Sequence, residues 1–202
     1  MLGTALAAGG ATAIVRAISG QSGPLTGAAT EIPATVQTSQ PQPATEPTAI
    51  PLAASQPLRI EIPVLNISAP VMRLGDDPGG SVQVPPLGNH NLTGWYDRSV
   101  MPGQAGTSVI LGHVDTLTGT SVFFYIKTLT RGDTIKVVRA DGSTAVFSVD
   151  GVQRVTKATF PAGEIYGNTR YPGLRLITCG GPFDTAARQY LDNIVVYSHL
   201  IS

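Results

Sequence analysis

The sequence lacks the cysteine content of a disulfide-stabilised or zinc-binding protein. It contains a single cysteine, Cys179, so neither an intrachain disulfide nor a cysteine-based metal cluster can form. The histidines are His90, His113 and His199, and no two of them stand at metal-ligand spacing. We therefore expect no metal and no cofactor, and we interpret His90 as a solvated loop residue.

Charged residues are also scarce. Lys+Arg number 13 and Asp+Glu 13, so the formal net charge is +0, and no run of Lys or Arg occurs. A diffuse basic field that would hold nucleic acid or an acidic membrane face is absent. The 42% hydrophobic content supports one packed domain rather than two.

Composition divides the chain into three parts. Residues 1–19 are apolar and small, shorter than the roughly 20 residues of a membrane span, and lack a basic start. They are a truncated membrane anchor, a weak signal peptide, or an amphipathic or disordered leader. Residues 20–56 are rich in Pro, Thr and Ser and predict a flexible linker. Residues 57–202 are expected to form the single packed domain.

The last part contains short β-branched runs separated by turn signals, and no long stretch has a helical period. Such a pattern favours an all-β, eight-stranded barrel over alternating helices and strands. The runs are residues 59–62, 71–74, 81–84, 108–111, 135–138, 145–155, 174–178 and 193–197. Asp141-Gly142 predicts a hairpin turn, and residues 122–129 and 162–166 are the best candidates for single helical turns.

Cys179 ends an apolar strand and is followed by Gly180 and Gly181. A strand end fixes the backbone of a nucleophile, and glycines leave space for a substrate carbonyl. Free cysteine is, however, often a small buried hydrophobe, and on position alone that reading is favoured.

His113 ends a second apolar strand. If this strand runs beside that of Cys179 in the same sense, both side chains share one rim of the barrel. An imidazole there could stabilise a thiolate or protonate a leaving amine, although a lone histidine is more often structural. Asp115 and Thr116 could orient the imidazole or line a groove, or Asp115 could simply begin a turn.

Arg188 follows Cys179 by nine positions, across an expected wide turn over residues 180–187. A returning strand would bring its guanidinium near the thiol, where it could hold an oxyanion. The competing interpretation is a surface ion pair with Asp184 or Asp192.

Together these segments resemble the sortase family, and its class F branch from high-GC Gram-positive bacteria in particular. The similarity includes His113-Val114-Asp115-Thr116 and Thr178-Cys179-Gly180-Gly181 and covers almost all of residues 58–202. The matching segments are residues 58–65, 94–96, 102–116, 139–142, 174–181, 183–184 and 192–197.

The resemblance implies a barrel-shaped cysteine transpeptidase that cleaves the Thr-Gly bond of a Leu-Pro-x-Thr-Gly sorting signal. It implies Cys179 as nucleophile, His113 as acid and base, and Arg188 as the oxyanion-binding cation. An amine of a peptidoglycan precursor would accept the acyl group at the outer face of a Gram-positive cell membrane, and a monomer tethered by its N-terminal segment is expected. The implied substrate-binding residues are Asp115, Thr116, Thr178, Gly180, Phe160, Ile165 and Tyr166.

Two alternatives remain open at this stage. An L,D-transpeptidase-like enzyme also uses Cys and His, but it places an arginine two residues after the cysteine, where this chain has Gly181. A catalytically silent barrel that binds a peptide or wall component would keep Cys179 as a core residue.

Overall fold

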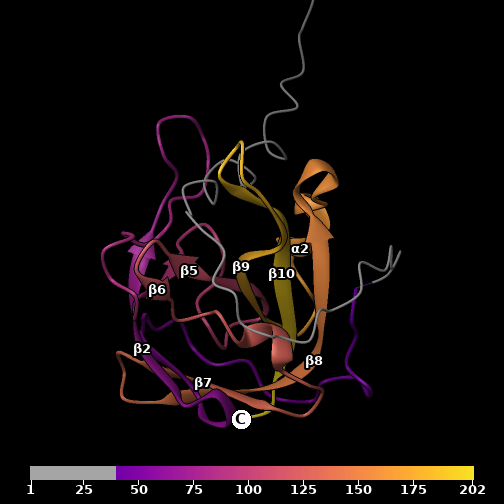
Figure 1. Ribbon diagram of the computed structural model, residues 1–202. Coiled ribbons are helices and arrows are strands. Elements are labelled where there is room, and N and C mark those ends of the chain that lie inside the picture. Colours follow the sequence, from indigo (N-terminus) through magenta and orange to yellow (C-terminus); the bar gives the residue numbers. More distant parts are fainter. Residues whose placement is uncertain (1–39) are drawn as a thin grey trace, which may run out of the picture.

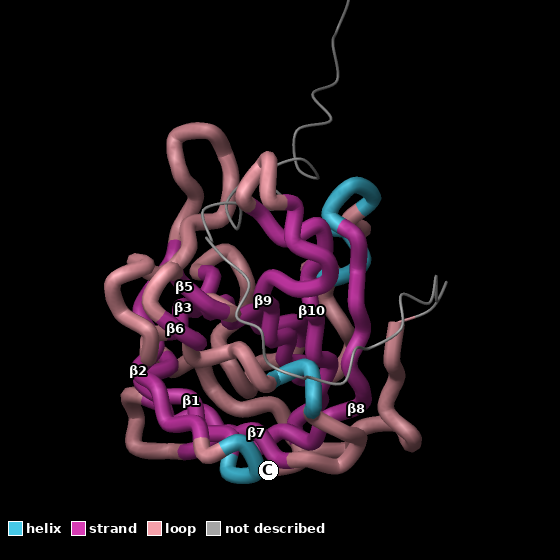
Figure 2. The backbone as a smooth tube through the Cα atoms, in the orientation of Figure 1, coloured by secondary structure: helices cyan, strands magenta, loops and turns pink. Residues whose placement is uncertain are grey.

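The computed structural model describes residues 40–202, so residues 1–19 and most of the predicted linker lie outside it. The chain forms a closed barrel of eight strands in the order β1-β2-β3-β4-β9-β10-β8-β7 (Figure 1 and Figure 2). This confirms the predicted all-β barrel. The barrel strands are β1 (Pro57–Ile62), β2 (Ile67–Leu74), β3 (Thr93–Tyr96), β4 (Gly106–Gly112), β7 (Thr134–Arg139), β8 (Thr144–Thr156), β9 (Pro172–Asp184) and β10 (Gln189–Leu200).

The remaining elements are short. A two-stranded ribbon of β5 (Asp115–Thr116) and β6 (Gly119–Thr120) follows β4. The 3-10 turns are η1 (Pro63–Leu65), η2 (Ile126–Thr128) and η3 (Lys157–Thr159), and the α-helical turn is α2 (Ala162–Ile165). Single helical turns within residues 122–129 and 162–166 are therefore confirmed. In the described part of the chain, no helix has the length and apolar character to cross a bilayer.

Two apolar clusters cover the two faces of the central strands. One fills the barrel interior and takes side chains from every strand, among them Ile110, Leu176 and Ile194. The other contains the alternate residues Ile177 and Val195 and lies on the outer face of β4, β9 and β10, beneath the loops that flank them. Because both faces are covered, these strands are continuous hydrophobic runs in the sequence.

One predicted strand was wrong and one real strand was missed. Residues 81–84 alternate like a strand, but only the isolated bridge between Asp76 and Val82 forms there. β3 takes the vacant place in the barrel. Its Gly94 interrupts the strand pattern because a Cβ at this position would lie 2.2 Å from a methyl carbon of Leu74.

The turn prediction at Asp141-Gly142 is confirmed. β7 and β8 pair antiparallel on either side of it, and Gly142 has a φ of 82°, which glycine adopts without strain. The hairpin joins two neighbouring strands of the barrel wall.

Residues 40–56 contact the barrel, although composition predicts a flexible linker there. The amide of Leu52 donates to the carbonyl of Gly103 (2.8 Å), and the amide of Asp141 donates to the hydroxyl of Ser55 (3.1 Å). Ala49 and Leu52 also pack against the interior cluster. This segment therefore covers part of the barrel, and the predicted boundary at residue 57 remains a prediction.

Candidate active site

The thiol and the imidazole are brought together by a parallel strand pair. β4 and β9 run in the same direction, and their last paired residues are Leu111 and Ile177. His113 and Cys179 each lie two residues beyond that pair. The parallel arrangement on which the expected shared rim depends is therefore present.

The sulfur of Cys179 is enclosed in this conformation. The residue is 0% exposed, and burial raises the pKa of its thiol to about 12. The ammonium of Lys157 opposes this rise in pKa, because its Nζ donates to Sγ at 3.3 Å. The nearby carboxyl of Asp115 adds to the rise. Cys179 is thus held as a neutral thiol in the closed site.

His113 is also buried and is held by a backbone carbonyl. Its Nε2 lies 2.6 Å from the oxygen of Pro85, and since a carbonyl can only accept, Nε2 carries the proton in this contact. Burial lowers the pKa of His113, and proximity to His90 lowers it further, while the Pro85 hydrogen bond partly offsets both. The imidazole is therefore neutral in the closed site.

Two loops cover this rim. The loop between β2 and β3 places Pro85 on His113 and packs Val82 against the outer cluster that contains Cys179. The loop between β8 and β9 adds the three apolar residues that the resemblance assigns to the sorting signal, Phe160, Ile165 and Tyr166. The rings of Phe160 and Tyr166 contact each other, with their centroids 6.2 Å apart. A substrate must displace part of this cover to reach the sulfur.

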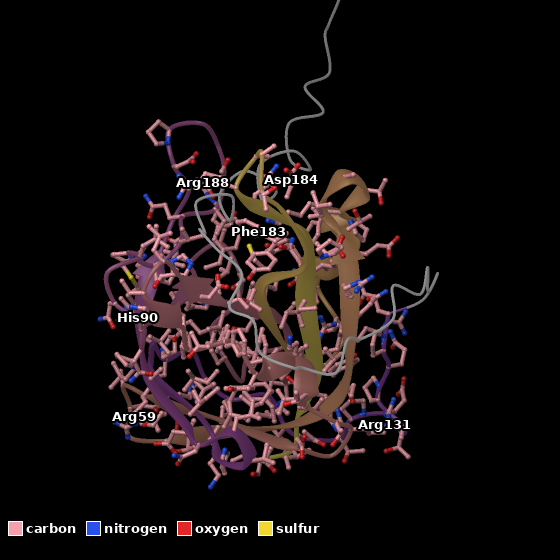
Figure 3. All side chains as sticks on the ribbon, viewed as in Figure 1. Arg59, His90, Arg131, Phe183, Asp184 and Arg188 are labelled. Carbon is pink, nitrogen blue, oxygen red and sulfur yellow. The ribbon has the colours of Figure 1, made fainter. Side chains whose placement is uncertain are left out.

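Arg188 is not held against the thiol. β9 continues to Asp184, so the turn is shorter than the expected one, and Arg188 lies just outside the final pair of Gln189 with Asp184. That pair is five residues along β9 from Cys179, roughly 17 Å of extended chain at ~3.3 Å per residue. Arg188 is exposed with a φ of 51°, at the same end of the molecule as Asp184 (Figure 3).

The expected alternative partners of Arg188 are engaged elsewhere. The carboxylate of Asp184 accepts from the amides of Ala186 (2.9 Å) and Ala187 (3.0 Å), and that of Asp192 pairs with Arg154 (3.2 Å). Within residues 40–202, Arg188 forms no ion pair with either carboxylate. Its guanidinium is therefore available to a ligand at the hairpin tip.

Asp115 and Thr116 lie in the β5–β6 ribbon next to the site. The hydroxyl of Tyr190 donates to Oδ2 of Asp115 at 2.5 Å, and burial raises the pKa of that carboxyl. Oγ1 of Thr116 lies 3.3 Å from Nε2 of His90, which also contacts Thr118 at 2.9 Å. His90, expected to be a solvated loop residue, therefore has side-chain partners in the ribbon.

Thr178 and Gly180 flank the nucleophile but have other surroundings. Successive residues of a strand alternate between faces, so the side chain of Thr178 points into the barrel, opposite Cys179. Its hydroxyl is buried without a partner among the described residues. A Cβ at Gly180 would lie 2.6 Å from Cγ1 of Ile194, so the space that its missing side chain leaves is filled.

Comparison with known proteins agrees with this geometry. A family model described as the sortase domain matches residues 60–201. The chain belongs to the sortase family. No curated protein matches the sequence significantly.

Solved sortase structures share the fold. The lid mutant of sortase A from Corynebacterium diphtheriae is 21% identical with a TM-score of 0.55, and the match covers 74% of this chain and 73% of that one. Sortase C-1 from Actinomyces oris is 21% identical with a TM-score of 0.55, covering 71% and 73%. A Clostridium perfringens sortase D5 transpeptidase is 19% identical with a TM-score of 0.53, covering 73% and 79%. By its membership of this family, the protein is a cysteine transpeptidase of the sortase type.

Sequence reasoning missed three residues that surround the sortase thiol. Lys157 follows β8, Tyr190 lies on β10, and Asn193 is the cross-strand neighbour of Cys179. The amide of Asn193 is fully buried, and neither its nitrogen nor its oxygen has a partner among the described residues. The polar Asp192-Asn193 pair at the start of an apolar strand was the available signal for Asn193, whereas nothing local distinguishes Lys157.

Proposed function

We propose that this sortase cleaves the Thr-Gly bond of a Leu-Pro-x-Thr-Gly sorting signal and transfers the acyl group to an amine. The observation that most directly supports this proposal is the parallel pairing of β4 and β9. The strand ends that precede His113 and Cys179 lie at one rim of the barrel because of this pairing. We assign the chain to class F on the motifs around these two residues.

In the proposed reaction, the thiolate of Cys179 attacks the threonine carbonyl carbon and a carbon–sulfur bond forms. The imidazolium of His113 protonates the glycine nitrogen as the carbon–nitrogen bond breaks, which leaves a thioacyl enzyme. An incoming amine then gives a proton to His113 and attacks the thioester, releasing Cys179. Both tetrahedral intermediates carry an oxyanion, for which Arg188 is the proposed partner.

This role for Arg188 requires a change at the tip of the β9–β10 hairpin. The residue is exposed, and it lies five residues along the chain from Asn193, the cross-strand neighbour of Cys179. Bending of the turn onto a bound peptide would bring the guanidinium toward the scissile carbonyl. A carboxylate or carbonyl of the signal would stabilise that closed form through the five donors of the guanidinium.

The leucine and proline of the signal are proposed to pack against Phe160, Ile165 and Tyr166. These side chains already pack in the apolar cluster that contains the thiol, and burial of aliphatic groups needs shape and desolvation rather than charge. Asp115, Thr116, Thr178 and Gly180 remain proposed contacts, although Thr178 would have to act through its backbone.

The acceptor is proposed to be an amine of a peptidoglycan precursor at the outer face of a Gram-positive cell membrane. The Pro/Thr-rich composition of residues 20–39 would suit a tether that holds the domain within a wall, with residues 1–19 as part of the anchor. A monomer would be sufficient, since all proposed catalytic groups lie on one chain.

The test is intact-mass spectrometry after incubation with a Leu-Pro-x-Thr-Gly peptide library and candidate amines. We expect a thioacyl adduct on Cys179 that disappears when an acceptor is added. Cys179→Ala should form none, and His113→Ala and Arg188→Ala should lose at least about a hundredfold in rate, as for an oxyanion contact of ~3 kcal/mol.

Arg59→Ala is the matched control for Arg188, because Arg59 is exposed at the opposite end of the barrel (Figure 3). It should keep the wild-type rate. Full activity of Cys179→Ala, or no adduct with any peptide in the library, would refute the proposed reaction.

A further inference from the structure

Lys157 is a buried cation in contact with the only thiol of the chain. It begins η3, directly after β8 ends, and is 5% exposed. β10 separates β8 from β9, so the side chain crosses β10 to place Nζ 3.3 Å from Sγ of Cys179. A long side chain is thus ordered at the nucleophile rather than extended into solvent.

This buried ammonium has no carboxylate partner. In the described part of the chain, no Asp or Glu lies within ion-pair distance of Lys157. The nearest acidic side chain on the facing strand, Asp192, is paired with Arg154 at 3.2 Å. Burying an unpaired cation is costly, so the contact favours a negative charge on its partner. The atom that accepts from this ammonium is the sulfur of Cys179, which can become an anion.

The other titratable groups that face Cys179 do not replace Lys157 in this role. Asp115 on β5 is an acid that opposes a thiolate, and its carboxyl is occupied by Tyr190 from β10. His113, which directly follows β4, hydrogen-bonds to the carbonyl of Pro85. Lys157 is therefore the group among these that favours a thiolate at Cys179.

We propose that Lys157 is a further catalytic residue of this sortase, whose ammonium stabilises the thiolate of Cys179. The inference rests on the proposed nucleophilic role of Cys179. The thiol proton passes to the imidazole of His113, and Lys157 keeps its own proton throughout. Lys157 thereby stabilises the anion while His113 keeps its proton for the departing amine.

The experiment measures alkylation of Cys179 by iodoacetamide from pH 6 to 9, followed by intact mass without any substrate. Only the thiolate of a site whose cover has opened reacts, so the rate reports both the open population and the thiolate fraction, and the change of the rate between pH 6 and 9 isolates the thiolate fraction. Lys157→Met keeps the side-chain length and removes the charge, and we expect the rate to fall at least about tenfold, since an adjacent opposite charge shifts a pKa by ~1–3. Lys157→Arg should recover most of the loss.

Lys136→Met is the matched control, because Lys136 lies on β7 and is partly exposed. It should alkylate at the wild-type rate. An unchanged rate in Lys157→Met would overturn the proposal, as would equal losses in Lys157→Met and Lys157→Arg, which would indicate packing rather than charge. A Lys157-dependent thiol that forms no thioacyl adduct would instead refute the proposed function alone.

Discussion

Displacement of the β2–β3 loop is predicted to control access to the thiol, and Val82→Ala tests this. Val82 is 3% exposed and packs against the outer cluster that contains Cys179. The Val82 side chain contacts solvent when the loop opens. Truncation to alanine therefore destabilises the closed state and leaves the free energy of the open state unchanged. Removal of two buried carbons at ~0.8 kcal/mol each weakens closure by about 1.6 kcal/mol. Because 1.4 kcal/mol corresponds to a tenfold change in an equilibrium constant, the open population rises about fourteenfold.

The assay is the rate of Cys179 modification by methyl methanethiosulfonate, a small neutral reagent, followed by intact mass. Val137→Ala is the matched control, since Val137 is 0% exposed inside the barrel and does not touch the loop. It should lower global stability with little change in the modification rate. Equal acceleration in both variants would show that reagent enters by global unfolding, and no acceleration in Val82→Ala would refute control by the loop.

Two further predictions concern buried polar groups of the site. Asn193→Leu should raise the free energy of unfolding by about 1 kcal/mol or more in urea titration, because it removes a buried amide that has no partner among the described residues; a less stable variant would contradict this. Burial lowers the pKa of His113 below 6.5, so its contribution to stability is present above pH 6.5 and lost as pH falls toward the folded-state pKa. His113→Gln, which retains a donor for Pro85, should lose less stability than wild type on acidification, and parallel pH profiles would exclude this contribution.

The barrel could be predicted because its strands bury one or two faces and therefore show period-two or continuous apolar patterns. Such patterns failed at residues 81–84, which were predicted to be a barrel strand, whereas β3 forms that strand. Ser81-Val82-Gln83-Val84 alternates in sequence as a strand does, but Ser81 and Val82 are both buried and the segment packs as part of a loop on the outer cluster. Alternation in the sequence therefore does not determine which segment supplies the backbone hydrogen bonds of the sheet.

Cys179 and His113 could be selected as candidates because each follows an apolar strand, and the parallel pairing then confirmed the arrangement of those strands. Lys157 could not be selected, since its contact depends on the order β8-β10-β9, in which strands distant in sequence become neighbours. The docking of residues 40–56 was hidden for a related reason. Only Ala49 and Leu52 of that segment pack against the interior cluster. Two apolar residues are too few to change the linker-like composition of the segment.

Burial disfavours the charged form of both proposed catalytic groups. It raises the pKa of the Cys179 thiol and lowers that of the His113 imidazole, so both changes oppose the thiolate–imidazolium form. The closed site is therefore chemically silent as well as inaccessible. An apolar peptide that displaces Val82 and Pro85 would admit water and the scissile carbonyl together, and both pKa values would move toward each other. In the proposed mechanism, binding of the signal is thus the event that generates the reactive pair, and Lys157 then stabilises the sulfur anion without requiring a second proton transfer.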